Sequence, residues 1–369
     1  NSDSRTVWTE NLKIFKFLQQ EQFNTVYPLN HSPLCQAIST LFEPDRLIGY
    51  SRRGGYSRQS NWVRMAFRWL GNRKKTPINL VDFWAMFAQT PYPAHLVNPK
   101  AQGKGYGLGV VLSGQNARRS LSPEYYAKII PVVFQRLQNS NNLKEKTIFF
   151  LGTQKEENFA KKLLFSLPKH LHPHIQNLAG KTSFQDLQEI LSNLELLLSP
   201  DTGTAHFAGH LGTPVEGFYL SSAHVFETGP YGEGHTVWQA NLPCSPCGEF
   251  QACKSMDKNE SNCLTAFNNP HFLYHLLHKE FTEQSLASKP LQSIIPYFSS
   301  FTDNNHFTTF LTWQSPLRLP QDIQRQKERN ILENYCAATK NTAQDIQLHN
   351  IEDNAIYAET DWIFPQNRP

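Results

Sequence analysis

Apolar and polar residues follow each other along the first part of the chain in a pattern that predicts alternating helices and strands. Apolar side chains recur at helical spacing in residues 8–18, and again at Leu34, Ile38 and Leu41. Apolar runs of strand length, residues 23–29 and 47–50, follow these two helices. This order predicts parallel βαβ units, which belong to an α/β fold with a doubly wound sheet.

The middle of the chain repeats the alternation. Strand-length stretches of mainly apolar residues occupy residues 108–113, 147–151, 194–198 and 215–219. Amphipathic stretches between them predict helices that begin at Pro123, shortly after Thr153 and at Phe184. Residues 91–109 are rich in proline and glycine, and we interpret residues 101–107 as a linker between two domains.

Beyond residue 268 the pattern weakens. Residues 271–278 and 321–338 have helical periodicity, and residues 294–301 are apolar and aromatic. Residues 351–364 are compatible with strand or coil. We therefore expect a partly helical C-terminal extension.

Residues 199–215, read as SPDTGTAHFAGHLGTPV, form the most distinctive local motif. The preceding strand ends at Pro200, and Asp201 stands where a helix N-cap is expected. An apolar helix over residues 205–211 follows, closed by Gly212 in the C′ position. Such a turn directs unpaired backbone N–H groups at one point, which favours an anion such as a phosphate. The alternative is an ordinary capped turn of an α/β protein.

This motif resembles the signature of the heptosyltransferase family, glycosyltransferase family 9. The matching pattern is D-T-G-x-x-H followed by A-x-x-L-G-x-P, carried by Asp201, Thr202, Gly203, His206, Ala208, Leu211, Gly212 and Pro214. The resemblance implies the GT-B fold, in which two Rossmann-like doubly wound domains face a cleft. It also implies inverting transfer of a sugar from a nucleotide diphosphate donor whose diphosphate lies at this turn.

The resemblance implies roles for residues outside the turn. Arg119 falls on the position of a cation that contacts the donor phosphates and stabilises the leaving group, with Arg118 as the neighbouring candidate. Glu156 or Glu157 corresponds to a ribose contact, although a carboxylate in a first helical turn can serve the helix dipole alone. Ser222 is expected near the phosphates.

The catalytic base stays unassigned. Within the turn, the resemblance implies donor contacts from Asp201, Thr202, Gly203, Thr204 and His206, and a purely structural role for His206 is equally open. Enzymes of the family keep an acidic base in a Gly-rich first turn. We expect that turn and the front strands around it to be missing from this sequence, which begins at Asn1 without a signal-peptide core.

Four of the six cysteines are clustered with the spacing C-x2-C-x5-C-x9-C, as Cys244, Cys247, Cys253 and Cys263. Four thiolates suit a tetrahedral structural site for zinc or iron, and such a closed site has no open position for catalysis. Disulfides are the alternative, which a reducing compartment disfavours. The resemblance extends here to a subset of the family that glycosylates autotransporter proteins. We expect no catalytic metal, and we expect Cys35 and Cys336 to be buried or inert.

Composition and charge describe a globular chain with one basic region. The 369 residues suffice for two domains, and 39% of them are apolar. The mean hydropathy is -0.49, and no apolar run reaches the roughly 18 residues of a transmembrane helix. The formal charge is +4, yet no acidic residue lies between Arg46 and Asp82. The basic, aromatic segment 46–75 is compatible with peripheral contact to an anionic membrane, with a phosphate-bearing acceptor or with a solvated loop surface, and we expect no nucleic acid partner.

These features together predict an inverting glycosyltransferase. It would transfer a heptose or a related sugar from a nucleotide diphosphate sugar, with ADP-heptose as the expected donor, to a lipopolysaccharide core sugar or a protein hydroxyl. We expect a bacterial cytoplasmic enzyme. A peripheral location on the inner face of the cytoplasmic membrane and assembly into an oligomer are both left open. The competing interpretations are a catalytically degenerate transferase-like scaffold or interaction protein, and a nucleotide-sugar epimerase, which would need no acceptor. The expected domains are residues 1–100 for the acceptor, 108–240 for the nucleotide sugar, 241–267 for the metal finger and 268–369 for the extension.

Overall fold

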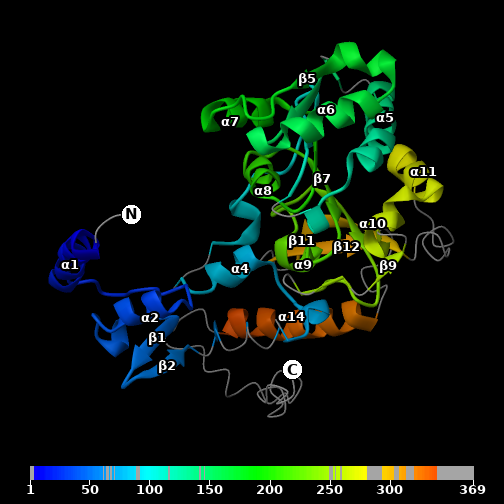
Figure 1. Ribbon diagram of the computed structural model, residues 1–369. Coiled ribbons are helices and arrows are strands. Elements are labelled where there is room, and N and C mark those ends of the chain that lie inside the picture. The colour runs from blue at the N-terminus through cyan, green and yellow to red at the C-terminus, as the bar shows by residue number, and fades with distance from the viewer. Residues whose placement is uncertain are drawn as a thin grey trace. The chain divides into compact units, whose positions relative to one another are not determined.

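The computed structural model (Figure 1) describes most of the chain up to residue 338. The described ranges are residues 4–60, 62–63, 66, 69, 71–88, 92–114, 117–140, 143–144, 146–248, 252–253, 255–257, 260–280, 293–302, 307–312 and 320–338. The predicted segment 351–364, part of the basic segment and the side chain of Cys336 lie outside them. Among the described residues, no helix is both long and apolar enough to span a membrane.

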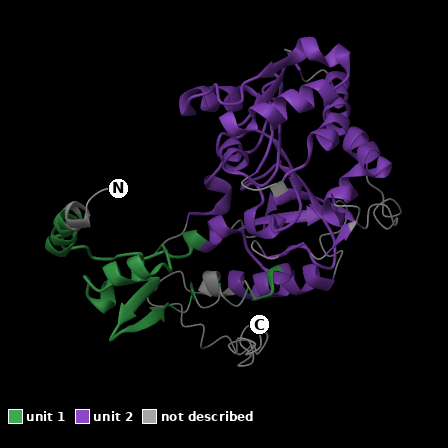
Figure 2. Cartoon of the chain, viewed as in Figure 1, with its two compact units in different colours: residues 1–73, 84–91, 336–369 green, residues 74–83, 92–335 purple. Residues whose placement is uncertain are grey.

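The chain divides into two compact units (Figure 2). The first contains residues 1–73, 84–91 and 336–369, and the second contains residues 74–83 and 92–335. Residues 101–107 therefore belong to the second unit, where Ala101 and Gln102 donate backbone hydrogen bonds to Glu233 and Gly212. This division differs from the predicted linker and from a domain boundary at residue 100.

The described elements of the first unit include the helices α1 (Ser4–Gln20) and α2 (Pro33–Ser39) and a hairpin of β1 (Tyr50–Arg53) and β2 (Tyr56–Gln59). The two predicted strands on either side of α2 meet in a single parallel bridge between Val26 and Leu47. Hydrogen bonds from Val26 N to Arg46 O (2.8 Å) and from Ile48 N to Val26 O (3.0 Å) hold this bridge. The predicted βαβ connection is thus present, but its parallel pairing is short.

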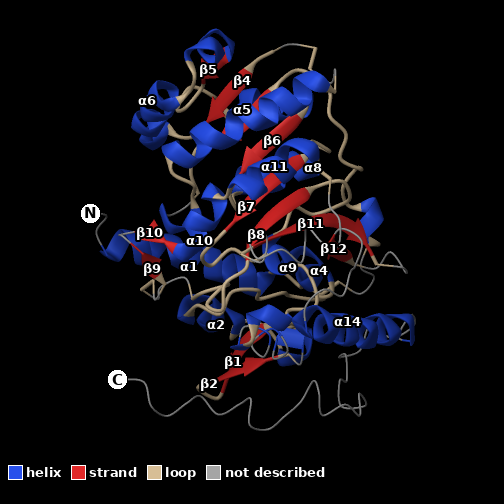
Figure 3. Ribbon diagram, turned by 90° about the vertical axis from the view of Figure 1, so that its right-hand side faces the viewer, coloured by secondary structure: helices blue, strands red, loops and turns tan. Residues whose placement is uncertain are grey.

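The second unit is built on one large mixed sheet with the strand order β12-β11-β8-β7-β6-β3-β4-β5 (Figure 3). Its strands are β3 (Leu108–Val111), β4 (Ile148–Leu151), β5 (Ile175–Asn177), β6 (Leu196–Ser199), β7 (Val215–Tyr219), β8 (Thr236–Ala240), β11 (Ile294–Phe301) and β12 (Thr308–Thr312). The strands from β3 to β8 pair in parallel, which confirms the predicted α/β fold. The last two strands pair antiparallel at the β8 edge, which means that part of the predicted C-terminal extension completes the main sheet.

Helices cover both faces of this sheet, so the side chains of its central strands are buried on both sides. The helices of the unit include α5 (Pro123–Asn139), α6 (Glu157–Ser166), α7 (Phe184–Asn193), α8 (Gly203–His210), α9 (Val225–Thr228), α10 (Asn262–Thr265), α11 (Pro270–His278) and α14 (Pro320–Ala338). In β6, Leu196 and Leu198 join the core formed with α5, α6 and α11, whereas Leu197 joins the core formed with α7 and α8. This alternation follows from the two-residue period of a strand and is typical of a doubly wound sheet.

The described residues also include several short elements. They are α4 (Leu80–Ala85), the two-residue strands β9 (Met256–Asp257) and β10 (Glu260–Ser261), and the 3-10 turns η1 (Pro44–Arg46), η2 (Arg73–Lys75), η3 (Ala94–Leu96), η4 (Ala117–Arg119), η5 (Gln154–Glu156), η6 (Lys169–His174) and η7 (Ala266–Asn268).

A buried charge on β7 connects the sheet to the helices on one face. The Glu216 carboxylate accepts hydrogen bonds from Arg136 of α5 (2.6 Å), from the Trp238 indole (2.7 Å) and from Lys279, which follows α11. Burial by itself raises the pKa of Glu216, but the charges of Arg136 and Lys279 outweigh burial and hold this pKa at about 2. The carboxylate therefore stays ionised and joins α5, β7 and the end of α11.

A second buried carboxylate belongs to Asp82 of α4. Its oxygens accept hydrogen bonds from the Tyr231 hydroxyl and from the backbone N–H of Thr308 (2.9 Å). Nearby, Arg329 of α14 donates to Pro77 O (3.0 Å), so the last described helix packs on the same region. Burial raises the pKa of Asp82 to about 7, although its hydrogen bonds and the charge of Arg329 oppose the rise.

The raised pKa of Asp82 predicts a pH-dependent stability. The ordinary pKa of an aspartate carboxyl is 3.8, and we take this value for the unfolded chain, so the folded state binds the proton more tightly. The resulting stabilisation is complete below about pH 4 and is lost as the pH rises through about 7, up to about 4 kcal/mol. Urea unfolding at a series of pH values should show this fall in the wild-type protein and a flatter profile in Asp82→Asn. If the free energy of unfolding changes with pH in the same way in both proteins, this role of Asp82 is contradicted. Asp45→Asn, at an exposed position, serves as the matched control.

Candidate functional site

The predicted phosphate turn connects β6 to α8 at the carboxyl end of the sheet. The N-cap of α8 is Thr202, with φ of -145°, and its hydroxyl accepts a hydrogen bond from Ala205 N at 3.3 Å. The prediction of Asp201 as the N-cap is therefore wrong by one residue. Gly212, at a φ of +76°, follows the end of α8 as predicted, in the left-handed conformation that glycine adopts without strain.

Asp201 takes part in an ion pair instead of capping the helix. Its carboxylate pairs with the guanidinium of Arg119, and Arg119 also donates to Asp201 O at 3.2 Å. The Thr228 hydroxyl donates to the same carboxylate at 2.9 Å, and His206 Nε2 lies 3.6 Å from its other oxygen. The exposed fractions are 5% for Asp201 and 14% for Arg119, so both partners are buried together.

The N-terminus of α8 is open to a ligand. Gly203 and Thr204 occupy the first turn of the helix, where backbone N–H groups have no acceptor within the helix. A Cβ added to Gly203 would meet no atom within 4 Å, so there is space beside this backbone. His206, 41% exposed, lies one turn further along the same helix. A helix N-terminus with open space and a neighbouring guanidinium provides the chemistry for binding a phosphate.

The two arginines of η4 have different partners. Arg119 reaches the phosphate turn, whereas Arg118 donates a hydrogen bond to the sulfur of Cys247 at 3.3 Å. The sequence placed both arginines at the donor site. The structure brings only Arg119 to the turn itself, and Arg118 lines a neighbouring cavity.

Glu156 has a clear local role in the structure. Its carboxylate accepts hydrogen bonds from the backbone N–H and the hydroxyl of Thr153, both at 2.7 Å, and from the Ser113 hydroxyl at 3.1 Å. Burial opposes but does not outweigh these hydrogen bonds, which lower the pKa of Glu156. Thr153 and Glu156 thus form a capping box. Glu157 pairs with Lys161 on the surface, and a ribose contact by either glutamate stays a prediction.

The loop after β7 lies next to the phosphate turn because β7 and β6 are neighbouring parallel strands. Ser222 is buried in this loop. Ser221 has a φ of +60°, a left-handed conformation that is uncommon for a serine. Thr228, further along in α9, is a site residue that the sequence reasoning missed. In the sequence, the adjacent turn motif Gly229-Pro230-Tyr231-Gly232 indicates that this region lies near the site, but it does not single out Thr228.

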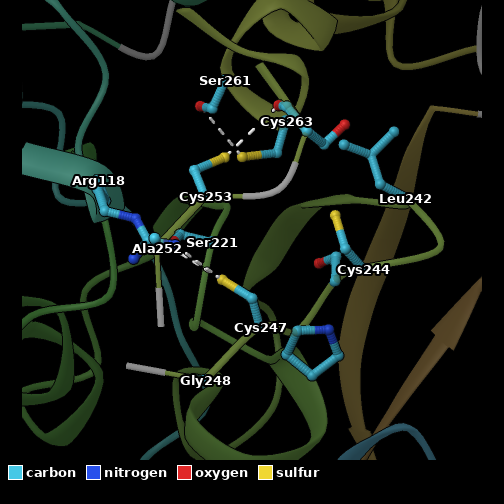
Figure 4. A pocket seen from close by; sticks show the side chains of 13 residues that line it. Arg118, Ser221, Leu242, Cys244, Cys247, Gly248, Ala252, Cys253, Ser261 and Cys263 are labelled. Carbon is cyan, nitrogen blue, oxygen red and sulfur yellow. Dashed lines mark hydrogen bonds between the residues drawn. The ribbon is translucent and has the colours of Figure 1, made fainter. Parts of the chain in front are cut away.

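The four clustered cysteines line one cavity of about 250 Å³ (Figure 4). Arg118, Ser221 and Ser261 also contribute to its wall. The thiols of Cys253 and Cys263 point toward each other across the upper part of the view. All the described cysteines are free thiols. No three metal-binding side chains of the described residues are close enough to hold an ion as they stand, but the structure does bring the four predicted ligands to one cavity.

The hairpin in the first unit gives shape to part of the basic segment. Its turn consists of Gly54 and Gly55, both at positive φ, as a tight hairpin requires. The register places Arg53 opposite Tyr56 and Ser51 opposite Arg58, so these side chains share one face. Arg53 and Arg58 are exposed on it, and Tyr56 is 74% exposed. The other face packs on α2, where the Ser57 hydroxyl donates to Gln36 at 2.6 Å.

This site lies in a segment that is similar to a known class of enzymes. Residues 123–258 match the family model of glycosyltransferase family 9 (heptosyltransferase). The matched segment contains the phosphate turn, Glu156, Ser222 and three of the clustered cysteines, whereas Arg119 and Cys263 lie outside it.

Individual proteins that are similar to this chain are heptosyltransferases or a family 9 glycosyl transferase. The lipopolysaccharide core heptosyltransferase OpsX of Haemophilus influenzae is 25% identical over 251 residues, which are 62% of this chain and 66% of OpsX. The chain thus spans slightly less than two thirds of the length of that relative. Two solved structures are also similar. ADP-heptose lipopolysaccharide heptosyltransferase II of E. coli has a TM-score of 0.42 and 14% identity, and the match covers 61% of this chain and 71% of that chain. The family 9 glycosyl transferase of Veillonella parvula has a TM-score of 0.40 and 15% identity, and the match covers 64% of this chain and 68% of that chain.

Proposed function

We propose that this chain is a heptosyltransferase-like glycosyltransferase. It transfers a heptose, with inversion, from a nucleotide diphosphate sugar to a hydroxyl group of a lipopolysaccharide core sugar or of a protein. The proposed donor is ADP-heptose. The observation that carries this proposal is the open N-terminus of α8 beside the buried Arg119, within and next to the segment that matches glycosyltransferase family 9.

The chemistry of the turn suits a diphosphate leaving group. As the bond to the sugar breaks, negative charge develops on the diphosphate, and the backbone N–H groups at Gly203 and Thr204 would stabilise it. Arg119 would bring its guanidinium to the same edge of the sheet, held there by its ion pair with Asp201. Asp201 would act as a positioning residue because its carboxylate pairs with the guanidinium, and Thr228 would act through Asp201, to which its hydroxyl donates a hydrogen bond. The similarity to OpsX, a lipopolysaccharide core heptosyltransferase, supports a heptose as the transferred sugar.

The turn can be tested by filling its open space. Gly203 has ordinary backbone geometry, and a Cβ at this position touches nothing, so Gly203→Val should fold normally while its methyl groups obstruct a bound phosphate. We expect calorimetry to show that the wild-type chain binds ADP more tightly than UDP. The Kd for ADP should rise at least about tenfold in Gly203→Val, a loss of about 1.4 kcal/mol. Gly71→Val is the matched control, because Gly71 has equally open surroundings in the other unit.

Two results would count against this proposal. Unchanged ADP binding by Gly203→Val would show that the phosphates lie elsewhere. Failure of a folded wild-type chain to bind either nucleotide would favour the scaffold interpretation instead. Arg119→Gln should also weaken ADP binding, but it leaves the buried Asp201 unpaired, so its thermal unfolding must be measured alongside.

We further propose that the four clustered cysteines hold a structural zinc or iron ion. Cys244, Cys247, Cys253 and Cys263 share one cavity, and they supply the soft thiolate donors that either metal accepts. Elemental analysis of the purified chain should find one bound metal ion per chain. Cys253→Ser and Cys263→Ser should each lower this content and the Tm, whereas Cys35→Ser, outside the cluster, should not. Native protein without metal, in which all four thiols react with a thiol reagent, would refute this assignment.

We also propose that the exposed face of the hairpin contacts anionic lipid headgroups. Arg53 and Arg58 lie on the same face as the exposed Tyr56, and basic residues contribute about 1 kcal/mol each near such a surface. Cosedimentation with phosphatidylglycerol vesicles should be salt-sensitive. It should weaken at least about tenfold in Arg53→Gln/Arg58→Gln and remain unchanged in the exposed Lys161→Gln. Equal binding to neutral phosphatidylcholine vesicles would rule out an electrostatic contact.

A further inference from the structure

Cys247 contacts both loops that flank the phosphate turn. In the sheet, β6 lies between β3 and β7, so the loop after β6 has the loops after β3 and β7 as its neighbours. Arg118, from the loop after β3, donates to Cys247 Sγ at 3.3 Å (Figure 4). From the loop after β7, Ser221 O accepts a hydrogen bond from Cys247 N at 3.0 Å, and the Ser221 hydroxyl lies 3.4 Å from the sulfur.

These contacts stabilise the backbone around Ser221 and the short turn η4. Ser221 has a left-handed backbone, which costs a serine about 1 to 2 kcal/mol unless its surroundings hold it. In η4, Arg118 is held by Cys247, and the next residue, Arg119, is held by Asp201. The position of the Arg119 guanidinium at the phosphate turn is therefore fixed from two sides, one of which is the cysteine cavity.

We propose that Cys247 is a positioning residue for the nucleotide site, through its hydrogen bonds to Arg118 and Ser221. This inference rests on the proposed function, because the nucleotide is its ligand. A sulfur that binds a metal still accepts hydrogen bonds, so the contact with Arg118 is compatible with the proposed ion and would orient its ligand. Loss of the Cys247 sulfur removes its contacts with Arg118 and with the Ser221 hydroxyl, so both neighbours of the phosphate turn are held less firmly.

Two substitutions of Cys247 distinguish the effect of the Arg118 contact on nucleotide binding from the effect of losing the metal. Cys247→Ser and Cys247→Ala both remove the thiolate, but serine keeps an acceptor for the Arg118 guanidinium. Because the C–O bond and its hydrogen bond are both shorter, the long Arg118 side chain must shift toward the serine hydroxyl to keep the contact. In the full chain, we expect the Kd for ADP to rise about tenfold in Cys247→Ala and to stay within about threefold of wild type in Cys247→Ser. Metal content should fall equally in the two variants.

A double variant tests whether Arg118 transmits the effect. Arg118→Ala/Cys247→Ala should bind ADP about as weakly as Cys247→Ala alone, since one contact cannot be lost twice. If the Kd of the double variant instead rises by the product of the factors measured for the two single variants, the role of Arg118 is overturned. Equal Kd values for Cys247→Ser and Cys247→Ala would overturn the positioning role, because the metal alone would then account for the effect, and so would wild-type binding by both.

Hydrogen exchange provides a second readout that needs no nucleotide. In Cys247→Ala, amide exchange should accelerate in residues 117–120 and in residues 220–224, and Cys247→Ser should restore protection in both. This pattern would support the positioning role even if the wild-type chain binds neither ADP nor UDP, an outcome that defeats only the proposed function. Unchanged exchange in both loops of Cys247→Ala would overturn the inference directly.

Discussion

The buried ion pair between Arg119 and Asp201 is the contact on which the arrangement of the site depends. Arg119 follows β3 and Asp201 follows β6, and these strands are parallel neighbours in the middle of the sheet. Each partner alone would be a buried charge, which costs about 3 to 5 kcal/mol when its counter-ion is removed. The pair therefore fixes the positions of two loops whose residues lie 82 positions apart in the sequence.

The same pair explains why the helix end is available to a ligand. A carboxylate at the N-cap would accept the first N–H groups of α8 and bring negative charge to the point where an anion should bind. Because Asp201 is neutralised by Arg119, the cap passes to the uncharged hydroxyl of Thr202. The positive end of α8 then faces open space beside Gly203.

The sequence predicted the elements that have local signals, and it missed contacts that only the tertiary structure creates. The strand over residues 215–219 was predicted to the residue, since Pro214 sets its start and Val215, Phe218 and Tyr219 are typical strand residues. The N-cap was misassigned because Asp and Thr are both good caps, and only the distant Arg119 distinguishes them. The antiparallel pairing of β11 with β8 has no local signal, since apolar periodicity gives a strand but not its neighbour. The Thr228 and Cys247 contacts were missed for the same reason, whereas Arg119 was found by family resemblance alone.

The antiparallel pair of β8 and β11 also makes the cysteine segment an insertion. Ala240 ends β8 directly opposite Ile294, which begins β11, and Asn241 N donates to Ser293 O at 2.8 Å. The chain thus leaves the sheet and returns to the same rung of the ladder. Everything between is an elaborated hairpin loop whose ends are joined by backbone hydrogen bonds, whatever the thiols bind. The part of this segment before α11, which carries the cysteines, can therefore vary in length without changing the order of the strands, whereas α11 is held to the core and, through Lys279, to Glu216.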